Sequence, residues 1–286
     1  DEEYAVLQIR SEVKNRKPIP AEMTLHTVIR NEKGDVVGEE KTVAVLFDQE
    51  QRELTQRIVI EKPELWSAET PILYTCESTL MMGEEVVDAQ TEKFGIRTMS
   101  LDAKRGLRIN GESVKLRGAC IHHDSGLLGA ATFEDAQYRQ VAKLKEAGFN
   151  AIRMSHHPMA PAMLRACDEL GMYVMDETFD MWDRCKSDLD YGLYFREWWE
   201  KDVTAMVRKD YNHPSVILYS VGNEIPEIGT DHGAKTCHEL CEKIKALDET
   251  RYTLASINGV FAAGDQVDNI VADVSADLCA KGELDG

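Results

Sequence analysis

Several features of common protein classes are missing from this sequence. Lysine and arginine number 33 against 51 aspartates and glutamates, which gives a formal net charge of −18. Nucleic-acid binding depends on clustered cationic side chains, so this charge argues against such a partner. No apolar run approaches the length of a membrane span. We therefore expect no nucleic-acid or membrane partner, while a neutral polar substrate is compatible with the charge.

Targeting and cysteine-based motifs are absent too. The opening Asp1-Glu-Glu-Tyr4 matches neither a signal peptide nor an initiator start, so we expect the chain to begin inside a longer parent protein. The 7 cysteines are odd in number and include no C-x-x-C pair, which argues against a disulfide framework and a thiolate zinc site. Cys237 and Cys241, spaced as on one helical face, are expected in the core. A reducing, cytoplasmic location fits this usage best.

The first third of the chain has the pattern of short β-strands. Met23, Leu25 and Ile29 alternate with polar neighbours, and a turn-forming cluster follows them before the next strand begins. The expected strands after that turn cover residues 36–46, 54–60, 72–80 and 84–94. Six or seven strands with regularly spaced turns predict an antiparallel sandwich of immunoglobulin type.

From about residue 98 the pattern changes to strands that alternate with helices. Asn110 and Gly111 are typical of a hairpin turn, Thr132 is a candidate N-cap, and Pro161 is expected to open a helix that Gly171 ends. We expect strands at 114–121, 150–155, 172–177, 216–221 and 252–257. This order predicts a parallel sheet, either doubly wound or barrel. No G-x-G-x-x-G loop follows the first strand, so a dinucleotide-binding fold loses support.

The length of the chain limits how these elements combine. With 286 residues it cannot hold a sandwich and a full barrel of eight strand-helix units. The predicted organisation is an immunoglobulin-like β-sandwich at residues 1–97, followed at 98–286 by the N-terminal part of a (β/α)8 barrel, strands one to five. The open edges of an incomplete barrel predict self-association or poor solubility unless the missing strands are present, and a homo-oligomer is compatible with this.

Polar side chains follow four successive strands of the expected parallel sheet. The carboxyl ends of barrel strands meet at one mouth, where catalytic groups are presented. Glu224 is the leading candidate for a general acid, and a strand-end Glu that only faces solvent is the alternative. The residues at these four strand ends are His122 to Asp124, His156 and His157, Asp176 and Glu177, and Asn223 and Glu224.

The histidines do not have the spacing of a barrel metal site. Two ligands on one strand face need an H-x-H spacing, whereas adjacent His122 and His123 point to opposite faces, as do His156 and His157. We therefore expect no metal and no other cofactor, and assign these imidazoles to hydrogen bonds with sugar hydroxyls or a carboxylate. A barrel metallohydrolase remains an alternative.

An ordered set of motifs resembles a known family. Residues 63–74 and 94–97 resemble the end of a central sandwich domain. Residues 108–118, then Asn150-Ala-Ile-Arg-Met-Ser-His-His-Pro158, Asp176-Glu177 and Gly222-Asn-Glu224 resemble the first half of a barrel. In this order they resemble family two of the glycoside hydrolases, the group that holds β-galactosidases, β-glucuronidases and β-mannosidases.

The resemblance implies a role for each matching residue. Glu224 matches the general acid/base and Asn223 the neighbour that hydrogen-bonds the sugar 2-hydroxyl. His122 and His156 match imidazoles that line the sugar subsite. Arg153 matches an arginine near the nucleophile, with a buried ion pair as the alternative.

Two further side chains complete the expected substrate-binding set. Glu177 is assigned to it from its place at the end of strand three. Trp182 is expected to offer a ring face to the sugar, with a core position under the loop as the alternative.

Two departures from the family pattern limit what carries over. The metal-dependent β-galactosidases have a metal-binding Glu and His where this chain has Met181 and Trp182, so we expect no magnesium requirement. The family nucleophile is a Glu near the seventh strand, beyond the fifth strand at which this sequence pattern ends. We therefore expect part of a retaining β-glycosidase, by preference a β-galactosidase, that is inactive alone. The alternatives are β-glucuronidase or β-mannosidase specificity and a noncatalytic carbohydrate-binding or structural fragment.

Overall fold

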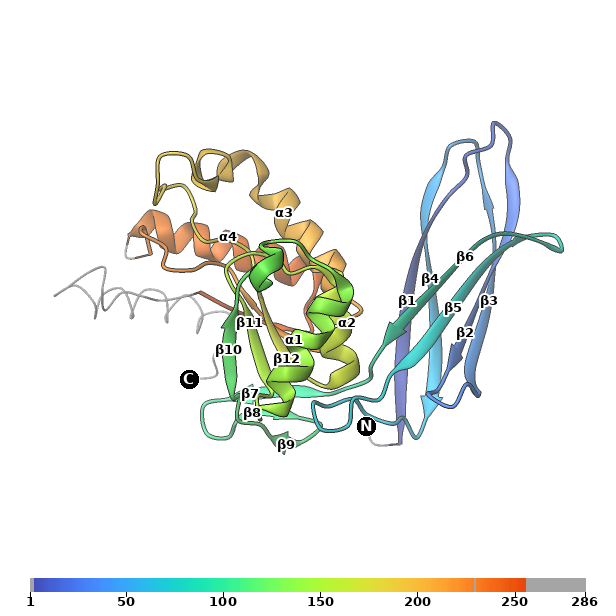
Figure 1. Cartoon of the computed structure of the whole chain (residues 1–286). Helices are drawn as coiled ribbons and strands as arrows, with labels where there is room; N and C mark the ends of the chain where they lie inside the picture. Colours follow the sequence, from blue (N-terminus) through green and yellow to red (C-terminus); the bar gives the residue numbers. More distant parts are fainter. Residues whose placement is uncertain (1–2, 229, 256–286) are drawn as a thin grey trace. The chain divides into compact units, whose positions relative to one another are not determined.

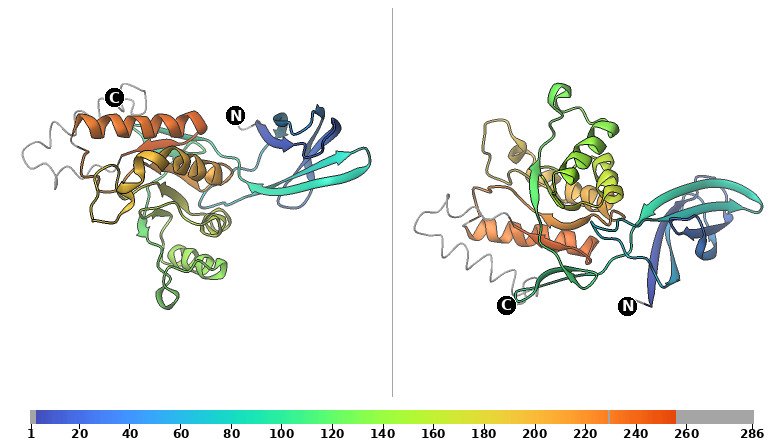
Figure 2. Two further views of the ribbon diagram at one scale, coloured as in Figure 1. Left: turned by 90° about the horizontal axis from the view of Figure 1, so that it is seen from above. Right: turned by 60° about the horizontal axis from the view of Figure 1, so that its bottom comes forward.

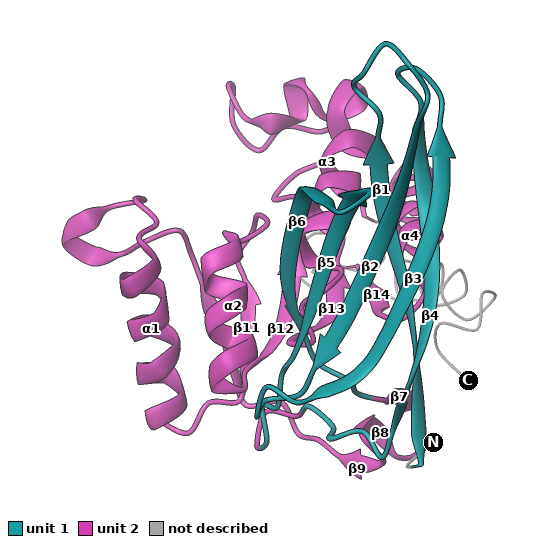
Figure 3. Ribbon diagram, turned by 90° about the vertical axis from the view of Figure 1, so that its right-hand side faces the viewer, with its two compact units in different colours: residues 1–66, 70–97 teal, residues 67–69, 98–286 magenta. Residues whose placement is uncertain are grey.

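The chain divides into two compact units. A computed structural model describes residues 3–228 and 230–255. One unit holds Asp1–Trp66 and Thr70–Arg97, and the other holds Ser67–Glu69 and Thr98–Gly286 (Figure 3). Each unit has its own hydrophobic core, so the two are described separately.

The first unit is an antiparallel β-sandwich, as predicted (Figure 1). One sheet has the strand order β3-β2-β5-β6, and β1 pairs with β4 in the other. Alternate residues of β2 are buried, among them Met23, Leu25 and Ile29, because successive side chains point to opposite faces of a strand. The strands are β1 (Tyr4–Lys14), β2 (Ala21–Arg30), β3 (Val36–Leu46), β4 (Gln51–Glu61), β5 (Tyr74–Met82) and β6 (Glu85–Phe94).

A short antiparallel sheet opens the second unit. It consists of β7 (Met99–Asp102), β8 (Gly106–Ile109) and β9 (Glu112–Ser113). The predicted hairpin turn is confirmed, because Ile109 pairs with Glu112 and the two residues between them have φ values of 53° and 83°. Positive φ at both central positions is what a type I′ turn requires, and Asn-Gly adopts it with little strain.

The rest of the second unit is a partial (β/α)8 barrel. Five parallel strands lie in the order β10-β11-β12-β13-β14, and one α-helix connects each strand to the next. Helices α4, α3, α2 and α1 follow one another in space as they do in sequence (Figure 2). The strands are β10 (Gly118–Ile121), β11 (Ala151–Met154), β12 (Tyr173–Glu177), β13 (Val216–Ser220) and β14 (Tyr252–Leu254); the helices are α1 (Glu134–Glu146), α2 (Pro161–Leu170), α3 (Phe195–Asp210) and α4 (Asp231–Leu247).

The buried face of each helix packs on this parallel sheet. The core of the unit includes Val141 of α1, Leu164 of α2 and Val203 of α3, together with apolar residues of the strands. Cys237 and Cys241 of α4 are buried in the same core, as their helical spacing predicts. Within the described residues, no helix combines the length and the apolar character needed to cross a membrane.

Most predicted element ends differ from the observed ones by a few residues. The first barrel strand begins at Gly118, so residues 114–117 are not part of it. Helix α1 begins at Glu134 with Phe133 at its N-cap, and the two acidic residues of its first turn favour this start through the helix dipole. Thr132 therefore precedes the cap. The last strand ends at Leu254, and the part of that prediction beyond residue 255 lies outside the described residues.

Gly171 provides a test of the packing around helix α2. Its φ is +74°, and a Cβ there would lie 2.2 Å from the Ala68 carbonyl oxygen. We expect Gly171→Ala to lower the free energy of unfolding by about 2 kcal/mol or more, since it combines backbone strain with a backbone clash. Gly148→Ala is the matched control, because Gly148 has φ +89° and no atom within 4 Å of the added Cβ. Urea denaturation of both variants measures the difference, and equal losses would contradict this explanation.

Candidate active site

The C-terminal ends of β12 and β13 place buried polar groups beside each other. Glu177 ends β12, Ser220 ends β13, and these two residues are neighbours in the sheet register. Both side chains are fully buried. A buried carboxylate is stable only when charged or hydrogen-bonding partners replace its water shell, so the partners of Glu177 define the site.

Glu177 is hydrogen-bonded on both oxygens. Arg153 of β11 donates to Oε2 through Nε at 3.1 Å and Nη2 at 2.7 Å, and Ser220 Oγ donates to the same oxygen at 2.7 Å. His156 Nδ1 lies 2.7 Å from Oε1. Burial opposes the charged guanidinium, but the Glu177 carboxylate outweighs burial and raises the pKa of Arg153. Glu177 therefore holds the arginine and the imidazole in place. This differs from the predicted substrate contact, because the carboxylate has no exposed surface.

Asn223 is held in one orientation by groups of opposite character. Its Oδ1 accepts from Arg153 Nη2 at 2.9 Å, and its Nδ2 donates to Asp180 Oδ1 at 2.7 Å. An arginine only donates and a carboxylate only accepts, so the amide cannot be reversed without losing both bonds. Its backbone N–H donates to the Phe179 carbonyl at 2.9 Å. Asn223 is thus fixed by the loop that follows β12 and by β11.

Glu224 follows directly and differs from its buried neighbours. Its side chain is exposed, and its φ is +45°. A non-glycine residue in this left-handed region carries about 1 kcal/mol of strain and persists only where its surroundings fix the backbone. A carboxyl at the end of a barrel strand, on a backbone fixed in this way, is suited to proton transfer at the mouth.

Trp182 lies beneath this turn and corrects one prediction. Its side chain is fully buried, and its indole N–H donates to the Val221 carbonyl at 2.8 Å. A Cβ at Gly222 would lie 3.1 Å from the same indole nitrogen and 2.6 Å from Ile225 Cγ1. Trp182 therefore has no ring face open to a sugar. It supports the turn that carries Glu224, which is the alternative left open by the sequence.

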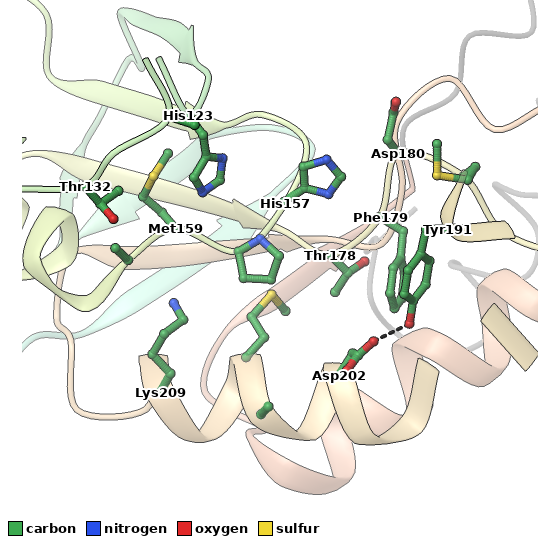
Figure 4. Close-up of a pocket in the computed structure, with 16 residues that line it drawn as sticks. His123, Thr132, His157, Met159, Thr178, Phe179, Asp180, Tyr191, Asp202 and Lys209 are labelled. Atoms are coloured by element: carbon green, nitrogen blue, oxygen red, sulfur yellow. Dashed lines mark hydrogen bonds between the residues drawn. The ribbon is translucent and has the colours of Figure 1, made fainter. Parts of the chain in front are cut away.

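The four histidines lie just beyond the ends of β10 and β11, so the strand alternation used in the prediction does not apply to them, and their rings form two pairs. The rings of His122 and His156 meet edge to face with centroids 5.0 Å apart, on the side of Glu177. The rings of His123 and His157 lie 6.3 Å apart. They line a pocket of about 560 Å³ (Figure 4). His156 of the first pair is hydrogen-bonded to Glu177.

This pocket is lined by both apolar and ionisable side chains. Met159 and Phe179 contribute to its lining, and Tyr191 donates a hydrogen bond to Asp202 on its wall (Figure 4). Burial and the Asp202 carboxylate raise the pKa of Tyr191, so the phenol stays protonated at neutral pH. The pocket therefore combines apolar side chains with the ionisable side chains of Asp180, Asp202 and Lys209, beside the His123 and His157 rings.

A second ion group adjoins that pocket, and its lysine, Lys209, helps to line the pocket. Lys209 of α3 contacts Asp210 and, at 3.0 Å, Asp176 Oδ2. Burial disfavours its charge, but the two carboxylates outweigh burial and raise the pKa of Lys209. Burial and the nearby Asp176 charge raise the pKa of Asp210 well above its usual range. One cation is shared by two carboxyl groups, which gives this cluster a structural role under strand β12.

The side chains of this region do not form a metal centre within the described part of the chain. No group of three or more His, Cys, Asp or Glu residues there has a metal-binding arrangement. Met181, at the position where the resemblance places a metal-binding Glu, is buried.

The fold is that of one class of protein, the (β/α)8 barrels, and it places polar side chains at the C-terminal ends of the parallel strands, where barrel enzymes present their catalytic groups. Comparison with known sequences gives the family. The profile for the TIM barrel domain of glycosyl hydrolases family 2 matches residues 102–284, and that for glycosyl hydrolases family 2 matches residues 1–97. The chain belongs to glycosyl hydrolase family 2.

Named relatives support this assignment. The chain is 41% identical over 236 residues to β-galactosidase BoGH2A of Bacteroides ovatus, and the match covers 82% of this chain and 28% of that protein. It is 41% identical over 169 residues to a putative β-glucuronidase of Formosa agariphila, covering 59% of this chain and 16% of that protein. The chain therefore spans less than a third of the length of these relatives.

Solved structures show the same fold. A family 2 member from Bacteroides cellulosilyticus superimposes with a TM-score of 0.89 at 38% identity, covering 95% of this chain and 35% of that one. A Bacteroides uniformis β-glucuronidase gives a TM-score of 0.82 at 29% identity, covering 96% of this chain and 34% of that one. These likenesses cover both the sandwich and the barrel portion.

Sequence patterns do not single out every residue of the network. Ser220 and Asp180 could have been identified from their positions, since Ser220 ends a strand and Asp180 lies in the loop directly after one. Lys186 has none, because it lies in an irregular loop and only the fold brings it to Asn223. The cis peptide bond between Ser155 and His156 likewise has no signature in the sequence.

The Arg153–Glu177 pair can be tested by a double-mutant cycle. We expect Arg153→Met to lower the free energy of unfolding by about 3 kcal/mol, because it leaves a buried carboxylate short of its cation. The loss should shrink when Glu177→Gln is added. Arg165→Met removes an exposed pair with Glu134, at side-chain exposures of 48% and 66%, and should cost under about 1 kcal/mol. Denaturant titration measures all four variants, and additive losses at Arg153 and Glu177 would contradict the coupling.

Proposed function

We propose that this chain is the sandwich and first barrel portion of a retaining β-glycosidase, with β-galactosides as the preferred substrates. The observation that carries the proposal is the exposed Glu224 on a strand-end turn fixed by Asn223. The substrate class is supported by the 41% identity to a β-galactosidase over 82% of the chain.

Glu224 is the general acid/base in this proposal. It protonates the glycosidic oxygen as the bond breaks and then removes a proton from the water that resolves the glycosyl intermediate. Asn223, whose amide is already oriented by Arg153 and Asp180, hydrogen-bonds the sugar 2-hydroxyl. His122 and His156 line the sugar subsite on the same side. Retention requires a second carboxylate as nucleophile, at roughly 5.5 Å from the first. We place it on a later strand of the full-length protein.

A second specificity has its own support. The matches to a putative β-glucuronidase and to a solved β-glucuronidase favour a substrate whose sugar carries a carboxylate. Assays of the full-length protein with nitrophenyl β-galactoside and nitrophenyl β-glucuronide distinguish the two. A higher kcat/KM for the glucuronide would replace the galactoside assignment.

The role of Glu224 predicts a dependence on the leaving group. In the full-length protein, Glu224→Gln should reduce kcat/KM for phenyl β-galactoside by ~100-fold or more, because this leaving group needs protonation. For dinitrophenyl β-galactoside, whose leaving group needs little protonation, the loss should be far smaller. Glu146→Gln, at an exposed site on α1, is the matched control and should leave both values unchanged. Equal losses on the two substrates would rule out the acid role.

Residues 1–286 alone are expected to be inactive. The described sheet supplies five strands and the proposed acid/base, while covalent hydrolysis needs the second carboxylate as well. Turnover of nitrophenyl β-galactoside by the purified chain, abolished by Glu224→Ala, would contradict the proposed location of the nucleophile.

A further inference from the structure

The carbonyl oxygen of Asn223 is held by a lysine from a distant loop. Lys186 Nζ donates to this oxygen at 2.8 Å, across 37 positions of sequence. The same ammonium group donates to Asp180 Oδ1, also at 2.8 Å. The Asn223 carbonyl belongs to the peptide that leads into Glu224, so Lys186 contacts the backbone from which the Glu224 side chain departs.

These contacts close a ring around one residue. Asp180 Oδ1 accepts from both Lys186 Nζ and Asn223 Nδ2, so the side chain and the carbonyl of Asn223 are tied to the same lysine–aspartate pair. Burial would raise the pKa of Asp180, but the hydrogen bonds from Lys186 and Asn223 outweigh burial and lower it. Asp180 is therefore ionised at neutral pH. The side chains of Lys186 and Asp180 are only 25% and 28% exposed.

The loop that carries Lys186 is itself built to hold this position. Asp190 Oδ2 accepts from the backbone N–H groups of Lys186 at 2.6 Å and Ser187 at 2.8 Å, and its Oδ1 accepts from Gly192 at 2.9 Å. At the other end of the loop, the Arg184 N–H donates to Glu227 Oε1 at 3.0 Å. Glu227 lies three residues after Glu224, so the loop and the Glu224 turn are joined at two points.

The contacts of Lys186 help to hold the backbone conformation of Glu224. Glu224 is held at φ +45°, a conformation that its surroundings must maintain. The charge-assisted bond from Lys186 fixes the peptide plane on the N-terminal side of Glu224, and such bonds are stronger than neutral ones. A catalytic group displaced by about 1 Å loses ~100-fold in rate, so this peptide plane matters for proton transfer.

We propose that Lys186 is a positioning residue for Glu224: its ammonium group, paired with Asp180, fixes the Asn223–Glu224 peptide and thereby aims the acid/base at the glycosidic oxygen. The inference rests on the proposed function of Glu224. In this proposal the reaction depends on Lys186, in the loop after β12, in addition to Glu224 and Asn223.

The test compares Lys186→Met with Lys143→Met in the full-length protein. Lys143 lies on α1, where its side chain is 65% exposed and pairs with Glu146, so the control makes the same chemical change away from the mouth. We expect Lys186→Met to lower kcat/KM for phenyl β-galactoside by ~10- to 100-fold and that for dinitrophenyl β-galactoside by less than ~3-fold. Lys143→Met should match the wild type on both substrates.

The leaving-group dependence separates positioning from general support of the fold. Equal losses on the two substrates, or no loss on either, would overturn the inference. If Lys186→Met does not fold by thermal melting, Lys186→Gln, which keeps an N–H donor without the charge, is measured under the same criteria. Glu224→Gln is assayed in parallel. If Glu224→Gln shows the leaving-group dependence and the Lys186 variant does not, the inference about Lys186 fails and the proposed function stands. If Glu224→Gln does not show the dependence, the proposed function itself fails.

Discussion

The buried Glu177 carboxylate is the group on which the arrangement of the mouth depends. It has no exposed surface, so it needs partners, and it takes them from three other positions: Arg153, His156 and Ser220. Arg153 then continues the network to the Asn223 amide. Three neighbouring strands, β11 to β13, are thereby connected at their C-terminal ends by charged hydrogen bonds. These bonds are strong because the surroundings exclude water.

The residues around Glu224 are likewise fixed by hydrogen bonds, which come from two parts of the unit. Arg153 of the Glu177 network bonds the side chain of Asn223. The loop after β12 bonds the Asn223 carbonyl through Lys186 and the Val221 carbonyl through Trp182. The exposed Glu224 carboxyl therefore extends from a turn in which Val221 and Asn223 are hydrogen-bonded to other parts of the unit. Such preorganisation is how an enzyme avoids reorganising its own groups during the reaction.

Much of the fold could be predicted from periodicity and turn chemistry. The Asn110–Gly111 hairpin and the helix from Pro161 to the stop at Gly171 follow local rules, and the structure confirms them. The separation of His122 from His123 does not follow from strand alternation, because β10 ends at Ile121. The contacts of Lys186 and the burial of Trp182 could not be predicted, because they depend on where the long loop between β12 and α3 returns to the sheet. The Thr132 cap failed because Phe133 takes the extended cap conformation instead.

The most direct test of the central claim, that Glu224 is an acid/base at a preorganised mouth, is rescue by azide. Glu224→Ala in the full-length protein is incubated with dinitrophenyl β-galactoside and sodium azide, and the product is identified by NMR. Removal of the acid/base opens the face from which water attacks the glycosyl intermediate, so azide should restore turnover and yield the β-galactosyl azide. An α-galactosyl azide would identify Glu224 as the nucleophile instead, and the absence of any rescue would contradict its role as acid/base.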